Sequence, residues 1–145
     1  MKLLGISGSL RRASTNSMLV REAARVFEPD AFVFADLDLP LYNQDVEDAG
    51  MPEAVTRLSE QIGAADAIVI STTEYNKGPS GVLKNALDWV SRIRPVTLTG
   101  KPVAALSAAA GMAGGQRATA TLYLMLIPFQ VRLVPGPELT VGQSG

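Results

Sequence analysis

Short apolar runs alternate with helical patterns along this chain, and the alternation limits the fold more than any other feature. Each apolar run is short enough to be one buried strand; the runs span residues 3–6, 31–35, 67–71, 102–107 and 130–134. Between them, apolar residues recur at helical spacing within residues 19–27, 52–65, 83–90 and 122–126. Such alternation predicts an α/β fold with a doubly wound parallel sheet and helices on both faces.

The segments outside this pattern are polar or rich in turn-forming residues. Residues 36–50 predict a long loop, and residues 137–145 have the composition of a loop that follows the fifth strand. We expect a single domain over residues 1–145 with no closing C-terminal helix. Either the sequence stops before the natural end, or another subunit covers the face on which that helix would lie.

Composition excludes several kinds of chemistry. The chain has no cysteine and no histidine, so a thiolate nucleophile, a Ser–His–Asp triad and a Cys or His metal site are all excluded. The acidic residues of the 36–50 loop fit solvated turns better than a metal site. A net charge of −1 argues against nucleic acid and anionic membranes as partners. The short apolar start is not a signal peptide, and no run could span a membrane, so we expect a cytoplasmic protein.

The stretch GSLRRASTNS follows the first strand and begins the first helix. Helix N-termini present free N–H groups and partial positive charge, and phosphate groups bind there readily. Hydroxyl and amide side chains can donate to phosphate oxygens, and a guanidinium adds a charged contact. We therefore predict a monophosphate site formed by Ser9, Arg11, Ser14, Asn16 and Ser17. The alternative interpretation is a set of ordinary helix caps beside solvated arginines.

Two motifs together resemble the NADPH-dependent FMN reductase family. The first, GSxRxxSxN, is matched within residues 8–16, and the second, PEYNxSxPxxLKNAxDW, within residues 74–89. The stretch LPLYNQDVE at 39–47 is also typical of the family. Thr73 departs from the motif where proline is common, and KGPSG at 77–81 shifts its register.

The resemblance implies a flavodoxin-like fold with strand order 2-1-3-4-5. It also implies that FMN is the cofactor, with its phosphate on the first motif and its ring against the loop of the second. The residues implied at the ring are Glu74, Tyr75, Asn76, Lys77 and Gly78, with Ser107 beginning the loop on the other side.

The resemblance further implies an oxidoreductase that receives hydride from NADPH or NADH and passes electrons to a quinone, an azo compound, free flavin or a similar small acceptor. Flavin carries the redox chemistry, so we expect no catalytic side chain, no metal and ping-pong kinetics. A homodimer or homotetramer is expected. The alternative function is that of a flavodoxin-like electron carrier, which would not use nicotinamide.

Overall fold

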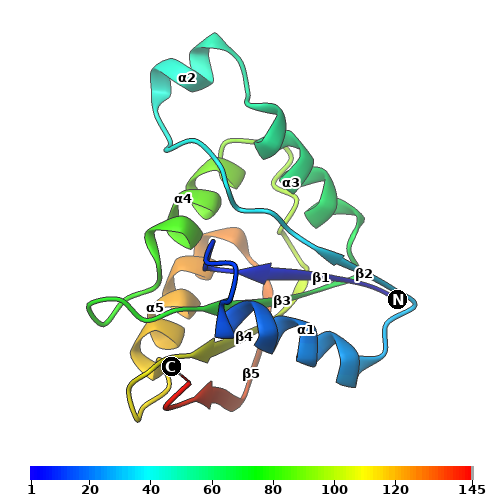
Figure 1. The fold of residues 1–145 in the computed structure, drawn as a ribbon. Coiled ribbons are helices and arrows are strands. Elements are labelled where there is room, and N and C mark those ends of the chain that lie inside the picture. Colours follow the sequence, from blue (N-terminus) through cyan, green and yellow to red (C-terminus); the bar gives the residue numbers. More distant parts are fainter. Residues whose placement is uncertain (145) are drawn as a thin grey trace.

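The computed structural model describes residues 1–144 and contains a five-stranded parallel sheet in the order β2-β1-β3-β4-β5 (Figure 1). The strands are β1 (Lys2–Ser7), β2 (Ala31–Phe34), β3 (Ala67–Thr72), β4 (Pro102–Ala108) and β5 (Arg132–Val141). The helices are α1 (Thr15–Phe27), α2 (Gln44–Ala49), α3 (Glu53–Ala64), α4 (Gly81–Val90), α5 (Gln116–Leu126) and a short 3-10 helix, η1 (Ile127–Phe129). This order confirms the predicted flavodoxin-like sheet.

Side chains of the central strands alternate between two apolar layers. In β3, Ile68 and Ile70 belong to a large core with residues of α3, α4 and α5, whereas Val69 belongs to a smaller core with Val20 of α1. Successive residues of a strand point to opposite faces, which explains the alternation. Helices therefore cover both faces of the sheet, as predicted. Helix α1 packs on one face, and α3, α4 and α5 pack on the other.

Two segments differ from the loops we expected. The expected loop at 36–50 contains α2, which projects from the body of the protein and has no buried residue (Figure 1). The expected loop at 137–145 is wrong up to Val141, because Leu139, Thr140 and Val141 continue β5 beside β4. The turn residues Pro135, Gly136 and Pro137 lie where the register of the β4–β5 pair shifts, so they bend the strand rather than end it.

The face that carries α1 is only partly covered. A groove of about 550 Å³ runs beside α1 between Phe27 and Val134, and a second of about 470 Å³ lies between Val26 and Leu139. Within residues 1–144 no helix follows β5. No helix in that part of the chain is long and apolar enough to cross a membrane.

Candidate cofactor site

The predicted site residues gather beyond the carboxyl ends of β1, β3 and β4. Ser7 pairs in register with Ser71, and Thr72 pairs with Ser107, so the three strands end side by side. The loops that leave them are β1–α1, β3–α4 and β4–α5. In open parallel sheets this edge is where ligands bind.

Gly8 brings the β1–α1 loop into contact with the neighbouring strand. Its N–H donates to the carbonyl of Ser71 at 2.8 Å. A Cβ at this position would lie 2.8 Å from Oγ of Ser80, so a side chain would force the two loops apart. Ser14 then caps α1 by accepting from the N–H of Ser17 at 3.3 Å. The N–H groups of Thr15 and Asn16, in the first turn, have no carbonyl partner within the helix.

The side chain of Asn16 connects three elements at this edge of the sheet. It is 1% exposed, and its Oδ1 accepts from Oγ of Ser71 at 2.7 Å and from the N–H of Ala108 at 2.9 Å. Its Nδ2 donates to the carbonyl of Ala108 at 2.9 Å. Its Oδ1 and one N–H of Nδ2 are therefore paired, and the amide side chain joins α1 to β3 and β4.

A cavity of about 260 Å³, here called the central cavity, opens between the first turn of α1 and the other two loops. It is lined by Ser9, Arg11, Ser14, Thr15, Asn16, Thr73, Glu74, Tyr75, Ala108, Ala110 and Ser144. Two buried side-chain oxygens within residues 1–144 have no hydrogen-bond partner, Oγ1 of Thr73 and Oγ of Ser144, and both belong to residues that line this cavity. Buried hydroxyls without protein partners are uncommon, and either a bound water or a polar ligand in the cavity would satisfy them.

The loop after β3 ends in a tight turn. Tyr75 and Gly78 exchange two backbone hydrogen bonds of 3.0 Å. The two residues between them, Asn76 and Lys77, have φ of 51° and 67°. Positive φ at both central positions defines the turn type that suits a hairpin, where glycine or asparagine is usual and lysine is not. Tyr75 is 63% exposed at the edge of the central cavity.

Glu74 connects this loop to the helix that follows β4. Its Oε2 accepts from the N–H of Ala118, in the first turn of α5, at 3.2 Å. A carboxylate at a helix N-terminus is stabilised by the free N–H groups and the helix dipole. The contact therefore holds the two loops that the resemblance places on either side of the flavin ring.

Ser107 supports the β4–α5 loop from beneath. It is fully buried, and its Oγ donates to the carbonyl of Gly114 at 2.6 Å. Gly114 and Gly115 both have positive φ, and a Cβ at Gly115 would lie 2.8 Å from Oγ of Ser107. The structure therefore gives Ser107 a role in shaping the loop, whereas we expected it at the border of the ring.

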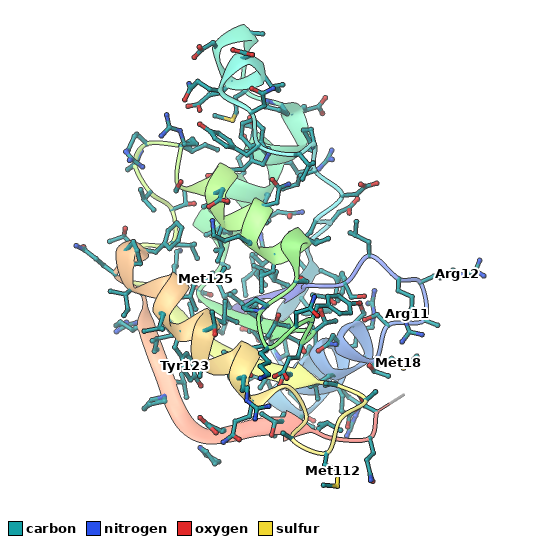
Figure 2. The ribbon with its side chains drawn as sticks, turned by 90° about the vertical axis from the view of Figure 1, so that its left-hand side faces the viewer. Arg11, Arg12, Met18, Met112, Tyr123 and Met125 are labelled. Atoms are coloured by element: carbon teal, nitrogen blue, oxygen red, sulfur yellow. The ribbon has the colours of Figure 1, made fainter. Side chains whose placement is uncertain are left out.

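The two adjacent arginines differ in position. Arg11 lines the central cavity, and its N–H donates to Oγ of Ser9 at 3.3 Å. Figure 2 shows Arg11 closer to Met18 of α1, whereas Arg12 extends away from the body of the protein. Ser17 donates to Oγ of Ser7 at 2.9 Å and does not line the central cavity.

Much of the second motif packs against the segment before α2. Asn85 and Trp89 of α4 both donate to the carbonyl of Pro40, at 2.9 and 2.7 Å. Trp89 is fully buried and meets the ring of Tyr42 edge-on, with 5.0 Å between the ring centroids. Desolvation, followed by the hydrogen bond to Glu47, raises the pKa of Tyr42. These residues hold α4 and the 36–43 segment together and contribute nothing to the central cavity.

Sequence reasoning missed Thr73 and Ser144. Thr73 departs from the motif, and its hydroxyl directly after a central strand is a signal for a ligand contact. Ser144 carries no such signal, because its position depends on backbone hydrogen bonds from Gln143 and Ser144 to Gly111 and Ala109.

Comparisons with known proteins agree with the fold and identify the family. The family described as "NADPH-dependent FMN reductase" matches residues 1–145. An NAD(P)H-dependent FMN reductase of Pseudomonas aeruginosa is 44% identical over 146 residues, covering 99% of this chain and 79% of that protein. A quinone reductase of Escherichia coli is 37% identical, with 98% and 78% covered. The solved structure of FerB, a flavoenzyme NAD(P)H:(acceptor) oxidoreductase of Paracoccus denitrificans, superposes with a TM-score of 0.88 at 33% identity, covering 95% of this chain and 77% of FerB.

Proposed function

The chain belongs to the NADPH-dependent FMN reductase family, and from that premise we propose that it is an NAD(P)H-dependent oxidoreductase that holds FMN in the central cavity. The central cavity is the observation that supports this most directly. It joins the first turn of α1 to the two loops beyond β3 and β4, and its wall includes the unpartnered hydroxyls of Thr73 and Ser144. A phosphate-bearing ligand with polar groups along its length fits such a wall.

The chain divides the binding of FMN between two sets of residues. The residues that would hold the phosphate are Ser9, Arg11, Ser14 and the backbone N–H groups of Thr15 and Asn16, all at the central cavity. The ring would lie against the loop of Glu74, Tyr75 and Asn76, whose turn continues through Lys77 and is closed by the pairing of Tyr75 with Gly78. Asn16, Ser17 and Ser107 act through their side-chain hydrogen bonds to the surrounding strands and loops.

Bound FMN supplies the redox chemistry, accepting hydride from NADPH or NADH and passing two electrons to a small acceptor such as a quinone. The protein's residues have the tasks of binding and orientation. The Glu74–Ala118 hydrogen bond fixes the spacing of the two ring loops. Exposed Tyr75 leaves one side of the site open, so that a nicotinamide and an acceptor can enter in turn.

The reaction is tested by mixing the purified holoprotein with NADPH or NADH in a stopped-flow spectrometer. We expect a yellow protein whose flavin absorbance bleaches with either or both nucleotides and returns when a quinone is added. Double-reciprocal plots of the initial rate against nucleotide concentration, made at several quinone concentrations, should give parallel lines, as ping-pong turnover requires. A yellow protein that neither nucleotide bleaches would be an electron carrier, and the proposed activity would be wrong.

The phosphate contacts are tested by comparing FMN with riboflavin, which lacks the phosphate. Charge-assisted hydrogen bonds contribute about 1.5–3 kcal/mol each, so FMN should bind at least ~100-fold tighter, about 2.7 kcal/mol. Arg11→Ala should remove a large part of this difference and leave riboflavin affinity almost unchanged. Arg12→Ala is the matched control and should have a much smaller effect. Equal affinity for the two flavins would exclude the phosphate site.

The assembly and location of the protein belong to the same proposal. We expect one FMN-binding domain per chain, in a cytoplasmic homodimer or homotetramer that uses α4 and the loops around it. The absence of cysteine supports the cytoplasmic location. Sedimentation at micromolar concentration tests the assembly, and a single 15.3 kDa species would contradict it.

A further inference from the structure

A second cavity, here called the arginine cavity, lies beside the central cavity. It measures about 330 Å³ and is lined by residues of the β1–α1 loop, by α1 and by the segment that follows β2. Ser9, Arg11 and Ser14 line both cavities, so one short turn separates them. In the proposed arrangement, the phosphate of FMN lies in the central cavity and leaves this space free.

The arginine cavity has an excess of positive charge. Arg11, Arg12 and Arg21 line it, and within residues 1–144 none of the three lies within 4.0 Å of a carboxylate oxygen. Asp36 is the one acidic residue in its wall, and its Oδ1 already accepts from the N–H of Asp38 at 2.9 Å. If Arg11 faces the phosphate of FMN, Arg12 and Arg21 remain for a second anion.

Arg21 is held in place by an aromatic ring. Its guanidinium carbon lies 4.3 Å from the ring centroid of Phe34, at the end of β2. Stacking of this kind occupies one face of the guanidinium and leaves the N–H edge free for a phosphate or carboxylate. Leu10, Met18 and Leu37 add apolar surface to the same cavity. The wall therefore suits a ligand that combines an anionic group with a flat or apolar part.

We propose that the arginine cavity binds the adenosine half of NADPH and recognises its 2′-phosphate through Arg12 and Arg21. The inference rests on the proposed function, because the nicotinamide must stack on a flavin ring at the β3–α4 and β4–α5 loops. NADPH is a dinucleotide and FMN a mononucleotide, so the adenosine end extends beyond the ring. The arginine cavity offers it unpaired positive charge on the far side of the turn of Ser9 and Ser14.

Asp36 places a negative charge in the wall, which opposes the binding of a 2′-phosphate. In other nucleotide-binding α/β proteins, a carboxylate near the second strand favours a free ribose 2′-hydroxyl and an arginine favours a 2′-phosphate. Here two arginines oppose one aspartate, which predicts a preference for NADPH over NADH. Asp36→Asn should increase that preference, since it removes the one negative charge from the wall.

The proposal is tested first on the wild-type holoprotein by calorimetric titration with 2′,5′-ADP, 5′-AMP and inorganic phosphate. We expect 2′,5′-ADP to bind at least ~10-fold tighter than 5′-AMP, a difference of about 1.4 kcal/mol. Equal binding of the two nucleotides would overturn the proposal. Inorganic phosphate binding as tightly as 2′,5′-ADP would reveal a general anion site and would overturn it as well.

Variants then assign the residues. The double variant Arg12→Ala/Arg21→Ala should raise KM for NADPH about tenfold or more, while KM for NADH and the affinity for FMN stay within about twofold. Arg25→Ala is the matched control, because Arg25 is on the same helix, pairs with Glu22 and does not line the cavity. An equal loss of FMN and NADPH binding in the double variant would place the cavity within the FMN site and refute the proposal.

The two proposals fail in different ways. Flavin that is bleached by neither NADPH nor NADH would contradict the proposed function. Flavin that is bleached equally well by both nucleotides, in the wild type and in the double variant, would contradict only the assignment of the arginine cavity.

Discussion

Replacing Asn16 by alanine should destabilise the protein far more than its small, polar side chain suggests. Three hydrogen bonds of 2.7–2.9 Å disappear, and the N–H and carbonyl of buried Ala108 lose their side-chain partner. A buried polar group left without a partner costs about 1–3 kcal/mol. The hydroxyl of Ser71 can rotate to another acceptor, so we count the two backbone groups and expect a loss of about 3 kcal/mol.

The measurement is urea unfolding of the apoprotein, followed by the fluorescence of Trp89. This residue is the single tryptophan and is fully buried, so its emission reports global unfolding. The midpoint should fall while the m-value stays constant, as expected when stability alone changes. Ser17→Ala is the control, because it removes one half-buried hydrogen bond of 2.9 Å and should cost only about 0.5–1.5 kcal/mol.

A double-mutant cycle separates this network from a general effect of the substitution. Asn16→Ala and Ser71→Ala should be coupled by about 0.5–3 kcal/mol, because the two side chains share a hydrogen bond of 2.7 Å. Additive losses would show that they do not interact. An Asn16→Ala variant that loses no more stability than Ser17→Ala would refute the reasoning altogether.

Three further substitutions test the loops around the central cavity. Lys77→Gly should stabilise the protein by about 1 kcal/mol in urea unfolding, because φ of 67° is unfavourable for a lysine, and any loss would contradict the turn described above. Gly8→Ala should lower the free energy of unfolding by about 1–3 kcal/mol and weaken FMN binding in a fluorescence titration, because its Cβ would meet Oγ of Ser80. Unchanged FMN affinity would show that the loop can move to accept the side chain. Glu74→Gln should cost up to about 1 kcal/mol at low ionic strength and less in 1 M salt, and a loss independent of salt would exclude the charge–dipole explanation.

The sheet could be predicted from the sequence because its central strands are buried on both faces. A run such as Ala67–Ser71 is apolar at almost every position, which distinguishes it from an exposed strand. The end of β5 could not be predicted in this way. Proline and glycine at 135–137 indicate a turn, and only pairing with β4 shows that the strand continues beyond them.

The site could be located from the sequence, but the tasks of its residues could not all be assigned. The first motif follows a strand and begins a helix, so an anion site at the helix N-terminus follows from local structure alone. The role of Asn16 depends on partners 55 and 92 residues away. Ser107 is similar, because its carbonyl partner is presented by a glycine-rich turn whose conformation a sequence pattern does not specify. Long-range hydrogen bonds of this kind are visible only in the folded chain.

The central cavity is also assembled from segments that a ribosome makes at different times. Its wall takes residues from the β1–α1 loop, from 73–75, from 108–110 and from position 144. While a ribosome is still making the first half of the chain, Ala108 does not yet exist, so the side chain of Asn16 lacks the partner that it has in the folded protein. The wall is first complete when the last of these segments has left the exit tunnel. If the central cavity holds FMN as proposed, nascent chains that end before residue 108 should emerge without flavin.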